Sequence, residues 1–104
     1  MSKIEAKKIV RKYAEKLKAE KYPFSAIYLF GSFAHNNPRA GSDIDVAVVS
    51  KKLNNKSAGA ELKLWKFREG IDDRIEPHGF SLEDFRDYWN PMAYEIKKTG
   101  IRIA

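Results

Sequence analysis

Four residues near the middle of the chain have the types and the spacing for metal and phosphate chemistry. They are Gly31 and Ser32, followed after ten residues by Asp43 and Asp45. Two residues that are two apart on a strand point to the same face, with backbones about 6.6 Å apart. From there their carboxylates can converge on a pair of metal ions, and Mg²⁺ takes carboxylate, phosphate and water oxygens as ligands. Taken alone, the two aspartates are explained equally well as solvated acids at the start of a strand.

The Gly31-Ser32 pair lies between a predicted buried strand and a predicted short helix. A glycine lets the main chain approach a ligand closely, and a helix N-terminus offers free N–H groups to phosphate. The Ser32 hydroxyl can donate to a phosphate oxygen. A plain strand-to-helix turn is the commoner explanation of this pair alone. Joined to the two aspartates, however, the pair is more informative, because Gly, Ser, Asp and Asp occur at this fixed spacing by chance at only about one in 10⁵ starting residues. The combination predicts a metal-dependent phosphate site.

The surrounding sequence predicts the elements that position these residues. Ser2 and Glu5 match a capping box at the start of an amphipathic helix that ends near Pro23. Strands are predicted at residues 26–30, 43–49 and 74–80, a loop at 36–41, and helices at 58–69, from 81 to 88 or 89, and after Pro91. The second strand is apolar on both faces, which is typical of a central strand. Pro77 favours an edge position or a strand end for the third strand.

Composition limits the class of protein further. A chain of 104 residues is long enough for one domain, taken as residues 1–104. It contains no apolar run of the length that spans a membrane and no secretory signal pattern, so a membrane association is not expected. The absence of cysteine excludes disulfides and thiolate zinc sites and fits a cytoplasmic location. His35 and His78 lack zinc-ligand spacing and are not expected to bind metal. The large aromatic residues are expected in the core: Trp65, Phe67, Phe85, Tyr88 and Trp89.

Most of the net charge of +6 belongs to the first predicted helix. Residues 1–21 contain eight Lys or Arg against three Glu, a net of +5. Such a segment is more often a solvated helix face than a surface for polyanions. Nucleic acid is therefore not the expected partner, although a nucleic-acid-binding domain stays an alternative that predicts strongly salt-dependent affinity.

The segment GSFAHNNPRAGSDIDVAVV resembles the G-S-x10-D-x-D signature of the DNA polymerase β-like nucleotidyltransferases. The short length, the order of predicted elements and the closing EIKKTGIRIA are similar to the minimal nucleotidyltransferase (MNT) branch of that superfamily. The resemblance implies an α+β (α/β) fold, with a small mixed sheet of three to four strands flanked by helices. It also implies an enzyme that transfers a nucleoside monophosphate from a nucleoside triphosphate to a hydroxyl.

The same resemblance implies roles for individual residues. Asp43 and Asp45 correspond to the aspartates that hold two Mg²⁺ ions, and Gly31 and Ser32 correspond to the pair that binds the triphosphate of ATP. Many relatives have Arg-Gly after G-S-x-A, whereas His35-Asn36 stand here. Arg39, in the same predicted loop, is the candidate to supply that arginine's contact to the nucleotide.

A third carboxylate on a later strand completes the site in this family, and Glu76 is the candidate here. Glu69 ends a predicted helix, while Asp72 and Asp73 lie in a turn where acids are ordinarily solvated. Alternation along the third strand directs Glu76 away from the face that carries Ile75. Asp72 and Asp73 stay open as alternatives, and so does an exposed Glu76 paired with Arg74.

The MNT resemblance also implies a partner. MNT antitoxins form complexes with HEPN ribonuclease toxins and transfer AMP to a toxin tyrosine. We therefore expect a HEPN-type partner, with ATP as the nucleotide. The alternative is a non-catalytic binding module that neutralises a toxin by contact alone.

Overall fold

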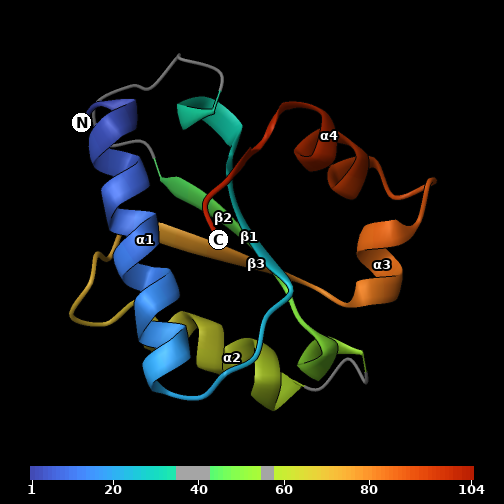
Figure 1. The fold of residues 1–104 in the computed structure, drawn as a ribbon, viewed down its shortest axis with the longest axis horizontal. Coiled ribbons are helices and arrows are strands. Elements are labelled where there is room, and N and C mark those ends of the chain that lie inside the picture. The colour runs from blue at the N-terminus through green and yellow to red at the C-terminus, as the bar shows by residue number, and fades with distance from the viewer. Residues whose placement is uncertain (35–42, 55–57) are drawn as a thin grey trace.

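Helices enclose a four-stranded mixed sheet in the computed structural model, which describes residues 1–34, 43–54 and 58–104 (Figure 1). The strands are β1 (Ala26–Phe30), β2 (Ile44–Val49), β3 (Ile75–Phe80) and β4 (Ile101–Arg102). Their order in the sheet is β3-β2-β1-β4. Strand β1 is antiparallel to β2 and to β4, whereas β2 and β3 are parallel. The expected α/β fold with a small mixed sheet is confirmed.

One face of the sheet is covered by α1 (Lys3–Ala19) and α2 (Ala58–Phe67). Ser2 caps α1 by accepting a hydrogen bond from the Glu5 amide at 3.1 Å, as the capping pattern predicts. The buried Tyr13 hydroxyl donates to the Leu64 carbonyl at 2.7 Å and so ties α1 to α2. This layer buries the alternate side chains of the strands: Ile27, Leu29, Ile44, Val46, Val48 and Ile75.

The opposite face is covered by α3 (Leu82–Arg86) and α4 (Pro91–Thr99), coloured orange to red in Figure 1. Phe85 of α3 packs 5.4 Å from Tyr28 and 5.7 Å from Phe80, measured between ring centroids. The buried members of this layer on the sheet lie at the middle and toward one end of the strands: Ala26, Ala47, Val49 and Phe80. The other end of the same face, where β2 and β3 begin, stays partly open to solvent.

Two short 3₁₀ helices follow the first two strands: η1 (Gly31–Phe33) after β1, and η2 (Lys51–Leu53) after β2. The predicted helical turn after Gly31 is therefore confirmed, as are the central position of β2 and the edge position of β3. The predicted loop at residues 36–41 lies outside the described residues. None of the described helices has the length and apolar character needed to cross a membrane.

The prediction that all the large aromatic residues build the core is wrong for three of them. Trp65, Tyr88 and Trp89 are 38%, 72% and 83% exposed, whereas Phe85 is buried. Helix α3 ends at Arg86, earlier than predicted, so Tyr88 and Trp89 fall in the connection to α4. There the two rings pack against each other, with centroids 5.3 Å apart, instead of against the sheet.

Candidate active site

A row of three residues crosses the sheet at its open end. Strand register pairs Phe30 of β1 with Asp45 of β2, and Asp45 with Glu76 of β3. The row lies on the α3–α4 face, because the intervening residues Ile44 and Ile75 are buried in the opposite layer. The Asp45 and Glu76 side chains are 27% and 39% exposed. The sheet therefore holds two carboxylates side by side where a ligand can reach them.

Gly31 lies directly against Asp45, at the point where β1 ends. Its φ of +74° is in the left-handed region that favours glycine. A Cβ at this position would overlap the Asp45 Oδ2 atom. Glycine is thus required here both for the turn and for the close approach of the main chain to the carboxylate. Ser32, the next residue, is partly exposed on η1.

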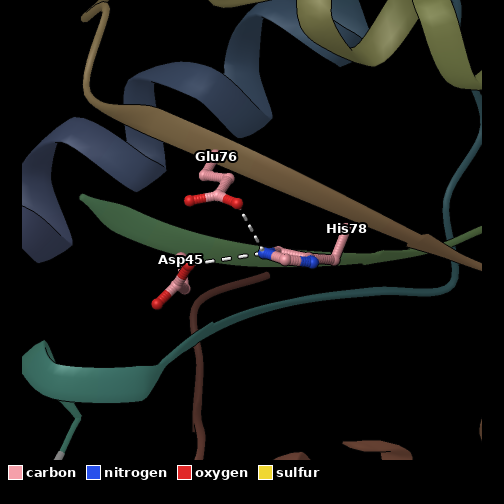
Figure 2. Close-up of side chains that lie close together, drawn as sticks. All are labelled: Asp45, Glu76 and His78. Atoms are coloured by element: carbon pink, nitrogen blue, oxygen red, sulfur yellow. Dashed lines mark hydrogen bonds and ion pairs between the residues drawn. The ribbon is translucent and has the colours of Figure 1, made fainter.

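His78 also points into this cluster, from the position two residues beyond Glu76 on β3 (Figure 2). Its Nε2 atom lies 3.3 Å from Asp45 Oδ1 and 3.9 Å from Glu76 Oε1. The imidazole ring packs edge-on against Phe30, with centroids 5.1 Å apart. Two-residue alternation along the third strand predicts the same face for His78 as for Glu76. The sequence prediction gave His78 no role at the site, because the two histidines lack zinc-ligand spacing.

Asp43 precedes β2 and is exposed, because the strand begins one residue later than predicted. It lines a pocket of about 240 Å³ together with Glu76, Trp65 and Arg68; the remaining lining residues are Asp73, Arg74 and Ile75. This volume is below the range of roughly 300–1,000 Å³ of pockets that enclose a small molecule. A nucleotide would therefore have to lie partly on the open sheet face.

The neighbouring acids and bases are engaged in other contacts. Arg74 donates to both carboxylate oxygens of Asp72, at 3.0 and 2.8 Å, and not to Glu76. This hydrogen bonding lowers the pKa of Asp72. Arg68 donates to the main-chain carbonyls of Asp73 and Ile75. The alternative in which an exposed Glu76 pairs with Arg74 is therefore wrong in the pairing, because that arginine binds Asp72.

The electrostatics of the cluster fit a cation. Burial, hydrogen bonding with Asp43 and the negative charge of Asp45 together raise the pKa of Glu76. The hydrogen bond with Asp45 raises the pKa of His78. Among the described residues, no lysine or arginine forms an ion pair with Asp43, Asp45 or Glu76. Neighbouring carboxylates that repel one another are a donor set that a divalent metal ion neutralises, and the basic side chain of His78 already lies against Asp45 and Glu76.

The structure thus brings together most of the predicted site. Gly31 contacts Asp45, Asp45 is the register partner of Glu76, and Asp43 lies beside Glu76 in the same pocket. Arg39 lies outside the described residues. The metal and nucleotide roles of these residues stay predictions.

A left-handed glycine after one strand, with carboxylates on the next two strands, is the arrangement expected from the resemblance to nucleotidyltransferases. Comparison of the sequence with known families agrees with this class. The family described as Polymerase beta, Nucleotidyltransferase matches residues 11–104, and the chain belongs to that family.

Two relatives are similar to this chain in sequence or in structure. A Methanocaldococcus jannaschii protein named putative protein adenylyltransferase is 39% identical over 67 residues, which are 64% of this chain and 66% of that protein. The chain therefore spans just under two thirds of that relative's length. The crystal structure of a putative nucleotidyltransferase from Sulfolobus solfataricus superposes with a TM-score of 0.63 at 20% identity. The superposition covers 81% of this chain and 78% of the other, and it shows the shared fold.

Proposed function

We propose that this nucleotidyltransferase transfers AMP from Mg-ATP to a tyrosine hydroxyl of a partner protein of the HEPN type. The observation that carries the proposal is that Asp45 lies against Gly31 and is the register partner of Glu76. The name of the Methanocaldococcus jannaschii relative, protein adenylyltransferase with the qualifier putative, supports AMP transfer to protein.

The residues divide the reaction between binding and proton transfer. The Gly31 turn and Ser32 bind the triphosphate, with Arg39 as a further phosphate contact. Asp43, Asp45 and Glu76 would hold the two Mg²⁺ ions, which neutralise the triphosphate and activate the attacking hydroxyl. The hydroxyl oxygen forms a bond to the α-phosphorus while the bond to the leaving pyrophosphate breaks. Glu76, which lies beside Asp45 and Asp43, accepts the hydroxyl proton.

An exposed aromatic surface supports a protein as the acceptor. It consists of Tyr88, Trp89, Met92 and Tyr94, which are 72%, 83%, 42% and 49% exposed. The Tyr88 ring packs 5.3 Å from Trp89 and 6.4 Å from Tyr94. Tyrosine and tryptophan dominate the binding energy of protein interfaces, and contiguous exposed apolar side chains mark such interfaces. This aromatic surface lies on the α3–α4 layer, which covers the same sheet face that carries Asp45 and Glu76.

The first experiment measures nucleotide binding without any partner. Calorimetric titration with ATP should give binding that depends on Mg²⁺ and is lost in the double variant Asp43→Asn/Asp45→Asn. Equal affinity with and without Mg²⁺, in both proteins, would exclude the metal site.

The second experiment measures transfer. The purified chain and a HEPN-type partner are incubated with Mg-ATP, and the intact mass of the partner should rise by one adenylate. Trp89→Ala should bind Mg-ATP normally, because Trp89 is not one of the proposed ligands. It should transfer less, because the exposed Trp89 side chain belongs to the aromatic surface proposed to contact the partner. A partner that is neutralised without a change in mass would favour the contact-only module. RNA binding that weakens strongly with salt, without transfer to the partner, would favour the nucleic-acid-binding domain.

A further inference from the structure

We propose that His78 is a metal ligand, and that with Asp45 and Glu76 it forms a mixed nitrogen–oxygen site that prefers Mn²⁺ to Mg²⁺. This inference rests on the proposed function, since the same carboxylates serve both. It adds to that function a nitrogen ligand, His78, and a preference between two metal ions.

The three donor atoms already lie close together. Asp45, Glu76 and His78 each offer one ligand atom within 4.8 Å of the others, and the His78 Nε2 atom is 3.3 Å from Asp45 Oδ1. Around an ion with metal–donor distances of about 2.1 Å, donors are roughly 3.0 Å apart when adjacent and about 4.2 Å when opposite. The separations in the cluster fall near this range.

The fold aims the imidazole at this point. Strands β2 and β3 are parallel and in register, so His78 lies beside Ala47, one step along the same face from the Asp45–Glu76 pair. The Phe30 ring packs against the imidazole with an interplanar angle of 67°. Figure 2 shows Nε2 between the two carboxylates. The His78 side chain is 26% exposed, so the cluster is accessible from solvent.

The types of donor atom decide between Mg²⁺ and a transition-metal ion such as Mn²⁺. Mg²⁺ prefers oxygen ligands and keeps several waters, whereas imidazole nitrogen suits divalent transition metals. Mn²⁺ binds nitrogen-containing sites most weakly of the first-row divalent ions, so its preference over Mg²⁺ is the smallest that two carboxylates with one imidazole should give. Three carboxylates alone would not discriminate in this way.

The competing explanation is that His78 only orients Asp45 through its hydrogen bond. The substitution His78→Gln separates the two roles, because a glutamine amide can still donate to Asp45 but brings no imidazole nitrogen. Loss of a ligand lowers the affinity for Mn²⁺ more than that for Mg²⁺. Loss of orientation lowers both affinities alike.

The test uses the protein with metal alone, without nucleotide. Free Mn²⁺ is measured by electron paramagnetic resonance during titration, and Mg²⁺ affinity is measured by competition. We expect the wild type to prefer Mn²⁺ and His78→Gln to lose that preference by about 10-fold or more. Equal decreases for the two ions, or an unchanged ratio, would overturn the proposal.

A second measurement does not depend on the folding of a variant. Electron spin-echo modulation of the Mn²⁺-loaded wild type should contain the coupling of an imidazole nitrogen. The chain has two histidines, so His35→Gln is the matched control that should retain this signal. A nitrogen signal that is absent, or that disappears with His35→Gln, would refute ligation by His78. Nitrogen ligation in a protein that never transfers AMP would leave this inference standing and refute the proposed function instead.

Discussion

Substitution of Gly31 by alanine tests whether the close approach of the β1 turn to Asp45 is needed for the site. The chain offers a matched control, because Gly31 and Gly70 have nearly the same φ, +74° and +79°. A Cβ at Gly31 would overlap the Asp45 carboxylate, whereas a Cβ at Gly70 would meet nothing within 4 Å. The two alanine variants therefore share the backbone strain and differ in the contact.

The expected loss of stability is similar for both variants. A left-handed conformation costs a non-glycine residue about 1–2 kcal/mol. For a domain of this size, 1 kcal/mol lowers the melting temperature by roughly 4–8 °C. The overlap with Asp45 adds little to this cost at Gly31, because the atom that is met is the end of a side chain that can rotate away. Thermal unfolding followed by circular dichroism measures both losses.

Metal affinity should separate the two variants. When Asp45 rotates away from the added methyl group, its Oδ2 atom leaves the position beside the turn. We expect Gly31→Ala to bind Mn²⁺ about 10-fold more weakly or worse, as a displaced ligand does, and Gly70→Ala to bind it as the wild type does. Both titrations are made without nucleotide at a temperature where the variants are folded, so that phosphate contacts of Gly31 play no part. If Gly31→Ala and Gly70→Ala retain equal metal affinity, the contact between Gly31 and Asp45 does not position a ligand.

Three other predictions concern single residues of the site and the core. Glu76→Gln should leave Mg-ATP binding largely intact, because Asp43 and Asp45 are unchanged and the glutamine amide still offers an oxygen, and it should slow transfer by about 10²-fold, as loss of a general base does. Asp72→Asn should transfer normally, because Asp72 is paired with Arg74. Single-turnover assays that give the reverse order would show that the third carboxylate is misassigned. Because Arg74 lowers the pKa of Asp72, this pair stabilises the fold above the ordinary pKa of aspartate and loses that effect as the pH falls through the lowered value. Urea unfolding should thus show Asp72→Asn less stable than the wild type at pH 7 and equal to it near pH 2, and a difference that persists in acid would contradict the assignment. Tyr13→Phe should destabilise the fold by about 1–2 kcal/mol, because the buried Leu64 carbonyl loses its donor, and an unchanged urea midpoint would mean that water replaces the hydroxyl.

The sequence by itself was enough to predict the first two strands and the candidate site residues at their ends. The apolar runs ending at Phe30 and Val49 predict buried strands, and β2 proves to be central as its two apolar faces imply. The G-S-x10-D-x-D spacing grouped Gly31 with Asp45, and the structure places the two in contact where β1 ends and β2 begins. Alternation along residues 74–80 also predicted correctly that Glu76 and Ile75 point to opposite faces.

Only the tertiary structure decided which distant residues join that pair. Glu76 becomes the neighbour of Asp45 because β2 and β3 are parallel with a fixed register, and no local pattern specifies the register between strands that a helix separates. His78 enters the cluster for the same reason. The exposure of Tyr88 and Trp89 was likewise decided by where α3 ends, since an aromatic residue is buried only if another element covers it. Sequence patterns predict single strands and the faces of their side chains, whereas contacts between strands depend on the packing of the whole sheet.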